Sequence, residues 1–179
     1  MAIQIFILSK LMEGDNYPYN LKKQIAELQS LDSINGLTES KLYYHFESLA
    51  KQGLIETKEV IKEENRPDRH VFSITEKGRE ALPKKIYKSL ENANTIGDMV
   101  IGLANIKYVD RDRIIRILEK KLQGMHAKWD FLFKKDRQHL VKPGGQVLAD
   151  FVSDYANFRI QGSIQYIERV IEHVRKEEI

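Results

Sequence analysis

Cysteine is absent from the 179 residues, and only four are proline. Without cysteine the chain can form no disulfide and no cysteine-based metal site, which suits a reducing compartment, and we expect a cytoplasmic protein. No apolar run is long enough to cross a bilayer, so no membrane partner is expected. Residues 1–12 are apolar but lack a basic flank and a small-residue cleavage site, and they predict a short buried helix rather than an export signal.

Motifs that carry catalysis are also missing from the sequence. There is no glycine-rich phosphate loop and no Gly-x-Ser-x-Gly elbow. No two histidines lie at metal-ligand spacing on one helix face. We therefore expect no enzyme, no metal site and no cofactor, although missing motifs alone do not exclude catalysis. The five histidines are scattered as His45, His70, His126, His139 and His173.

The charge balance gives little support for a nucleic-acid partner. The formal net charge is +3, a weak preference for nucleic acid at best. Residues 1–80 carry 11 Lys/Arg and 13 Asp/Glu (11 − 13 = −2), whereas residues 81–179 carry 18 and 13 (18 − 13 = +5). Any DNA-binding role of the N-terminal part must therefore be argued from local pattern.

The first half of the chain predicts three short helices. Apolar residues recur at helical spacing from Ile3 to Leu11, and Gly14 is a plausible stop. A second helix is expected from Pro18, which fits a first turn, to the region of residues 33–36. Thr38 predicts the N-cap of a third helix that ends at Gly53. The apolar side of that third helix is Leu42, Phe46 and Leu49.

A β-hairpin is predicted next. Residues 54–61 and 69–74 are rich in β-branched and extended-chain residues, and the polar stretch 62–68 between them contains Pro67. Thr75 then predicts the cap of a further helix. Three short helices followed by a two-stranded wing make the winged helix-turn-helix, whose third helix usually enters the major groove of DNA.

The remaining sequence reads as helical, and Pro83 marks a bend or a fresh helix start. A helix of residues 110–138 carries a heptad-type seam, and Lys142 to Gly145 break the pattern before a last helix of residues 146–176. That helix has two displaced apolar seams, so it should pack on two partners, its own chain and a second copy. The predicted dimerisation residues are Phe151, Tyr155, Phe158, Ile164, Ile167 and Ile171.

The expected fold is therefore mainly α with a small β-hairpin. Residues 1–82 should form an N-terminal winged helix-turn-helix DNA-binding domain. Residues 83–179 should form a helical C-terminal dimerisation domain, which could also sense a ligand.

The third helix and the wing resemble the PadR family of transcriptional regulators. Leu42-Tyr43, Phe46, Leu49 and Gly53-Leu54-Ile55 are similar to that family's recognition-helix signature, and residues 69–78 to the second half of its wing. Tyr44 stands where the family usually has proline. The likeness covers residues 1–80, and the rest is similar in kind to the family's subgroup with a long helical C-terminal region. The resemblance implies a dimeric repressor or activator, sometimes released from DNA by a small aromatic or drug-like ligand.

DNA recognition needs donors that reach base edges and phosphates. The third helix offers such donors in its first two turns, although Tyr43 could instead border the core and Tyr44 could simply be exposed. The wing offers others, although a solvated loop of mixed charge is an equal interpretation for any one of them. The candidate DNA-binding residues are Ser40, Lys41, Tyr43, Tyr44, Arg66, Arg69 and His70.

Trp129 is the single tryptophan and lies in the seam of the long helix. It could form the wall of a ligand pocket, but an aromatic residue at helical spacing is more often part of a core or interface.

The leading hypothesis is a sequence-specific DNA-binding regulator that acts as a homodimer on a double-stranded operator. The alternative is a winged helix that binds proteins and has no DNA role, which the acidic balance of residues 1–80 favours.

Overall fold

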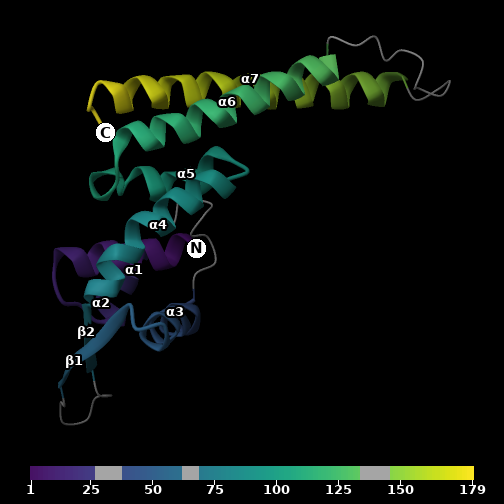
Figure 1. The fold of residues 1–179 in the computed structure, drawn as a ribbon. Coiled ribbons are helices and arrows are strands. Elements are labelled where there is room, and N and C mark those ends of the chain that lie inside the picture. The colour runs from purple at the N-terminus through teal and green to yellow at the C-terminus, as the bar shows by residue number, and fades with distance from the viewer. Residues whose placement is uncertain (27–37, 62–68, 134–145) are drawn as a thin grey trace. The chain divides into compact units, whose positions relative to one another are not determined.

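The computed structural model describes residues 1–26, 38–61, 69–133 and 146–179 (Figure 1). The described chain forms two compact units, residues 1–110 and 111–179. No described helix is both long and apolar enough to span a bilayer. The elements of the first unit are α1 (Ala2–Glu13), α2 (Pro18–Ala26), α3 (Glu39–Lys51), β1 (Ile55–Ile61), β2 (Arg69–Ile74), α4 (Glu76–Asn92), α5 (Ile96–Leu103) and the short 3₁₀ helix η1 (Ile106–Tyr108). The second unit consists of α6 (Arg111–Phe133) and α7 (Gln146–Arg175).

The core of the first unit is built around α1. This helix packs against α3, α4, α5 and β2, and an apolar helix enclosed in this way is expected to be buried on nearly all sides. Its buried apolar side chains are Ile5, Phe6, Ile7, Leu8 and Leu11. The N-terminal sequence therefore forms the buried helix that was predicted.

The wing is an antiparallel hairpin of β1 and β2, as predicted. Ile55 pairs with Ile74 at its base and Ile61 with Arg69 at its far end. The two isoleucines at the base are 1% and 7% exposed, whereas the side chains of residues 56–60 on β1 are all exposed. Burial of side chains therefore holds the base of the wing in place, but it does not hold the rest of β1.

The expected helix start at Pro83 is not observed, because Pro83 lies inside the continuous helix α4. Proline lacks the N–H that would bond to the carbonyl four residues earlier. The helix continues because its apolar side is buried in the core, where Leu82, Ile86 and Leu90 are each 0% exposed. The expected domain boundary at residues 82/83 consequently falls within a helix, and the chain divides after Asp110.

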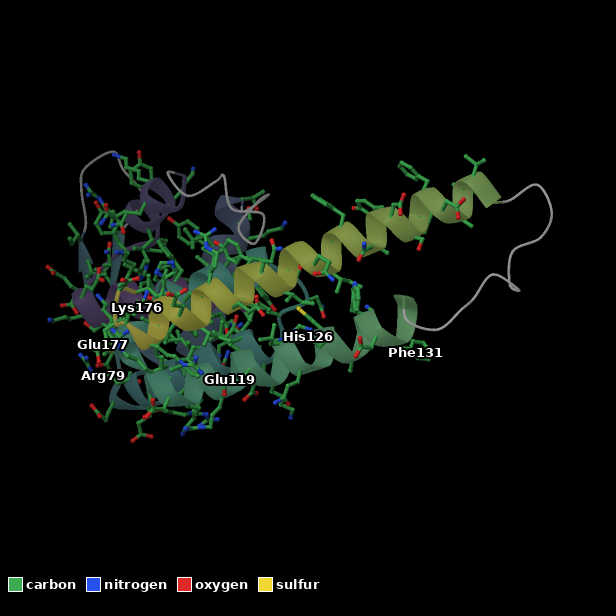
Figure 2. The ribbon with its side chains drawn as sticks, turned by 90° about the horizontal axis from the view of Figure 1, so that it is seen from above. Arg79, Glu119, His126, Phe131, Lys176 and Glu177 are labelled. Carbon is green, nitrogen blue, oxygen red and sulfur yellow. The ribbon has the colours of Figure 1, made fainter. Side chains whose placement is uncertain are left out.

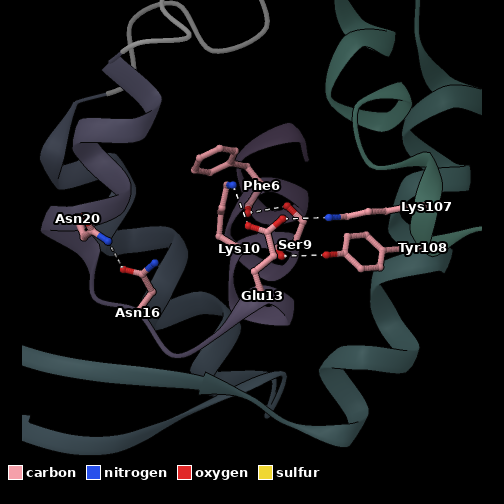
Figure 3. A network of polar contacts seen from close by, with 8 residues as sticks. All are labelled: Phe6, Ser9, Lys10, Glu13, Asn16, Asn20, Lys107 and Tyr108. Carbon is pink, nitrogen blue, oxygen red and sulfur yellow. Dashed lines mark hydrogen bonds and ion pairs between the residues drawn. The ribbon is translucent and has the colours of Figure 1, made fainter. Parts of the chain in front are cut away.

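Polar contacts attach η1 to α1 and so extend the first unit to residue 110 (Figure 3). Lys107 Nζ lies 3.1 Å from Glu13 Oε1, and Tyr108 Oη donates to the Ser9 carbonyl at 3.4 Å. The Glu13 carboxylate also accepts a hydrogen bond from Lys10 at 2.9 Å. These two lysines lower the pKa of Glu13 below its ordinary value. The segment after α5 is thereby part of the N-terminal core.

In the second unit α6 and α7 run side by side in opposite directions (Figure 2). Arg175 near the end of α7 pairs with Glu119 in the first half of α6 at 2.5 Å. Towards the other end, Trp129 Nε1 donates to Asn157 Oδ1 at 2.8 Å. The seam between the helices is apolar, with Leu118 and Ile167 both 0% exposed.

Candidate nucleic-acid interface

Helix α3 begins at the predicted cap. The Thr38 hydroxyl oxygen accepts a hydrogen bond from the Lys41 amide at 3.3 Å, which satisfies one of the free N–H groups at the helix start. Leu42, Phe46 and Leu49 are at most 1% exposed. Their spacing of four and three places them on one side of the helix, so the opposite side faces solvent.

That solvent-facing side carries the four donors predicted on α3. Ser40 and Lys41 are exposed in the first turn. Tyr43 and Tyr44 follow at 44% and 66% exposure, unusually open for tyrosine. The first turns of a recognition helix are those nearest the bases. The structure therefore brings the four candidates together on one accessible surface.

The C-terminal end of α3 is fixed by a Schellman motif. Gly53 has φ +68°, its N–H bonds to the Ala50 carbonyl at 2.8 Å, and the Leu54 N–H bonds to the Leu49 carbonyl at 3.0 Å. The buried side chains of Leu49 and Leu54 complete the motif.

The start of α4 then holds the end of α3. The Thr75 hydroxyl donates to the Gly53 carbonyl at 2.7 Å, and Lys77 Nζ donates to the Gln52 carbonyl at 2.7 Å. Thr75 is also the predicted N-cap of α4, because its oxygen accepts from the Gly78 amide at 3.1 Å. The C-terminal end of α3 is thus bonded to the start of α4, and its N-terminal end is capped by Thr38.

The wing contacts α3 through an aromatic pair. The rings of Phe46 on α3 and Phe72 on β2 lie 5.0 Å apart at an interplanar angle of 45°, a favourable arrangement for aromatic side chains. This contact packs the part of the hairpin near its base against α3.

The three predicted wing residues differ in their exposure and in whether the structure describes them. His70 is exposed on β2. Arg69 is half-buried, and its guanidinium lies 5.7 Å from the centre of the Tyr17 ring. Such a cation–π contact holds the guanidinium near the start of α2. Arg66 lies outside the described residues.

Acidic side chains share this surface with the basic ones. Glu47 is exposed on α3, one turn beyond Tyr43 and Tyr44, and Glu56 and Glu59 are exposed on β1. Carboxylates repel phosphates, but glutamate can accept a hydrogen bond from the amino group of cytosine. Glu47 lies on the same exposed side of α3 as the predicted residues.

His45 points away from the exposed side of α3. Its Nδ1 atom is enclosed and has no hydrogen-bond partner among the described residues. Burial, together with the positive charge of the chain's N-terminus, lowers the pKa of this imidazole below its ordinary value. His45 is consequently a packing residue that favours the neutral form.

The residues expected at a dimer interface divide into two groups on α7. Ile164, Ile167 and Ile171 are 4%, 0% and 5% exposed within the single chain, so they are already covered. The other three, Phe151, Tyr155 and Phe158, are 70%, 56% and 77% exposed. Trp129 is half-buried and bonded to α7, as described above.

The comparison with protein families matches this surface to a known domain. Residues 7–84 match the model of the transcriptional regulator PadR-like family. This segment is similar to the PadR-like family. It contains α3, the wing and the start of α4, and the family consists of transcription regulators rather than enzymes. None of the curated proteins matches the sequence significantly.

Solved structures of PadR proteins are also similar to the chain. Bacillus subtilis PadR in complex with operator DNA is 15% identical, with 97% of this chain and 99% of that chain covered and a TM-score of 0.45. The same protein in complex with p-coumaric acid is 14% identical, with 98% and 99% covered and a TM-score of 0.41. A PadR family regulator from Clostridium difficile is 25% identical, with 49% and 86% covered and a TM-score of 0.40.

Proposed function

We propose that this chain is a homodimeric, sequence-specific DNA-binding regulator that represses transcription. The observation that carries the proposal is the exposed side of α3 within a PadR-like domain. Lysine and tyrosine side chains there can reach phosphates, base edges and thymine methyl groups. A dimer that covers its operator would exclude other proteins from the same DNA, which is the simplest route to repression.

The DNA-binding part is tested by the double variant Lys41→Ala/Tyr44→Ala. We expect it to lose specific binding in a fluorescence-anisotropy titration, because each contact of this kind contributes about 1–3 kcal/mol. Lys84→Ala, which removes an exposed lysine of α4, is the control and should bind like the wild type. Unchanged affinity of the double variant for a selected duplex would refute the assignment of α3.

Salt separates this proposal from a winged helix that binds proteins. Phosphate contacts release counterions, so DNA affinity must fall steeply as salt is raised. Binding that is feeble, equal for all duplexes and insensitive to salt would favour the protein-binding alternative. A transcriptional reporter tests repression, since deletion of the gene should raise expression from its operator and a fall would indicate an activator.

The proposed dimer surface is the apolar face of the first half of α7. Its six large apolar side chains are 54% to 84% exposed. With roughly 150–200 Å² for each such side chain, they offer about 600–800 Å², close to what one partner contributes to a standard interface. At 100° per residue, Phe151 and the covered Ile167 project to roughly opposite sides of α7. The face comprises Val147, Leu148, Phe151, Val152, Tyr155 and Phe158.

A second copy is the occupant that we propose for this face. The same line of side chains on two chains is self-complementary around a twofold axis. We expect Phe151→Ser/Phe158→Ser to sediment as a monomer where the wild type is a dimer. Gln165→Ser/Arg169→Ser changes two exposed residues beyond the apolar line and should remain dimeric. A wild-type monomer at micromolar concentration would refute the dimer.

The proposed ligand response can be followed through Trp129. As the single tryptophan of the chain it reports on its surroundings without interference, and its bond to Asn157 joins α6 to α7. We propose that an aromatic acid binding near Trp129 weakens DNA binding by changing the geometry of the dimer. With p-coumaric acid as the probe, we expect both the tryptophan emission and the operator affinity to change. If neither changes, this compound is not the ligand, and an equally inert panel of aromatic acids would refute the proposal.

A further inference from the structure

The turn between α1 and α2 is bonded to the wing through its backbone. The Asn16 amide donates to the Phe72 carbonyl at 3.0 Å, and the Phe72 amide donates to the Asn16 carbonyl at 2.8 Å. The two residues form an isolated antiparallel bridge. One residue of the turn therefore acts as a short third strand beside β2.

Asp15, the preceding residue, binds both strands of the wing with its side chain. One carboxylate oxygen accepts a hydrogen bond from the Ser73 hydroxyl on β2, and the other pairs with the Lys58 ammonium on β1. Both partners lower the pKa of Asp15 below its ordinary value, Lys58 more than Ser73. The carboxylate is therefore ionised at neutral pH and holds two strands at once.

Strand β1 has an irregularity at the residue that contacts this carboxylate. Thr57 pairs with Phe72 and Glu59 with Val71, so Lys58 between them is the extra residue of a β-bulge. A bulge redirects a side chain and increases local twist. Without the bulge, the side chain of residue 58 would follow the regular alternation of side chains between the two faces of the hairpin. The irregularity of β1 thus coincides with the residue that contacts Asp15.

The backbone just before Asp15 also has an unusual conformation. Gly14 has φ +156° and ψ 167°, a region that residues with a side chain hardly enter. No heavy atom lies within 4 Å of a Cβ built on it, so space alone does not require glycine there. Glycine is required there because of this backbone conformation, which leads the chain into Asp15 beside the wing.

Burial cannot supply this restraint, because the side chains of β1 from Glu56 to Val60 are exposed. We propose that Asp15 is a positioning residue, which, through Lys58 and Ser73, holds the wing at a fixed angle to the α1–α2 turn so that wing and α3 meet DNA together. This inference deepens the proposed function and rests on it for the identity of the ligand. Lys58 has the same role and is not a phosphate contact in the bound state.

The first test needs no DNA. In Asp15→Ala we expect amide hydrogen exchange to accelerate at Asn16 and Phe72, whose N–H groups form the bridge, and to stay unchanged at the buried positions of α3. Thermal stability should change little, because exposed ion pairs contribute little to folding. Unchanged exchange at the bridge would overturn the proposal, whatever the protein binds.

The second test uses a duplex selected with the wild type. We expect Asp15→Ala to weaken binding roughly five- to tenfold, the low end of the effect of losing one DNA contact. Hydroxyl-radical protection should fade where the wing lies and persist where α3 lies. Lys58→Ala should behave alike, and the double variant should be no worse than either single one, because the two residues act as a unit.

Glu56→Ala is the matched control, since it removes the same charge from an exposed position of β1. It should tighten binding slightly or leave it unchanged. The proposal is overturned if Asp15→Ala instead binds more tightly with a salt slope steeper by about one, because Lys58 would then be a phosphate contact that Asp15 suppresses. Additive effects of the two alanine variants would also overturn it. A wild type that binds no duplex refutes the proposed function, and the exchange test still decides whether Asp15 holds the wing.

Discussion

Gly78 occupies the closest backbone approach found at the described glycines, and Gly78→Ala tests the architecture around α3. A Cβ built at this position lies 2.0 Å from the Leu54 carbonyl oxygen and 2.8 Å from Ile74 Cγ1. The Leu54 oxygen cannot simply move away, because it accepts a hydrogen bond from the Thr75 amide at 3.1 Å. The methyl group therefore has to push α4 away from the end of α3.

The size of the effect follows from the geometry. Real Cβ atoms stay at least 3.0 Å from other heavy atoms, so backbone must shift by about 1 Å at a hydrogen-bonded junction. Overpacking of this kind costs about 3 kcal/mol, the upper end of the usual range. For a unit of this size, roughly 4 °C of Tm is lost for each kcal/mol, which gives a fall of about 12 °C.

Differential scanning calorimetry of the full chain measures this shift, and Gly124→Ala is the control. Gly124 lies inside α6, and a Cβ built there has no heavy atom within 4 Å. Alanine should stabilise that helix by up to about 1 kcal/mol. The same substitution is thus expected to act with opposite sign at two positions. A Gly78→Ala protein that melts with the wild type would show that α4 does not approach Leu54 as described.

Two further predictions concern α3. Thr38→Ala should lower the free energy of unfolding by about 1 kcal/mol in urea titrations, because the Lys41 amide loses its acceptor, whereas Thr38→Ser should keep most of the stability. His45 should make the protein less stable in acid. Its folded-state pKa lies below the ordinary 6.5, so the unfolded chain binds the proton first, and stability should fall as the pH drops through 6.5 towards the folded-state value. In His45→Gln this part of the slope should vanish, and an unaltered slope would contradict the burial of Nδ1.

Local features of the fold could be predicted from the sequence because the interactions that produce them are local. Thr38 and Thr75 cap helices three residues from the amides that they bind, and Gly53 ends α3 in the left-handed conformation that glycine tolerates. The apolar spacing of Leu42 and Phe46 likewise determined which side of α3 is exposed. The exposure of four of the seven candidate residues follows from that spacing alone, and their contact with DNA stays a prediction.

Features that depend on distant residues could not be predicted in this way. Asp15 and Lys58 are 43 positions apart, and the bulge that brings them together leaves no mark in the alternation of β1. Pro83 was expected to mark a bend or to start a helix. It lies inside the continuous helix α4, because the burial of its neighbours in the core outweighs the local preference of proline. The two seams of α7 were recognised, yet only the structure shows that Ile167 is covered by the same chain.

DNA recognition by α3 can be measured by titrating a duplex selected from random DNA with the wild type and with Lys41→Ala/Tyr44→Ala, at two salt concentrations. We expect the wild type to prefer the selected duplex over a scrambled one and to bind it more weakly as salt rises. The double variant should lose this preference while remaining folded and dimeric. Equal binding of the two proteins to the selected duplex, or no selection of any sequence by the wild type, would contradict DNA recognition by α3.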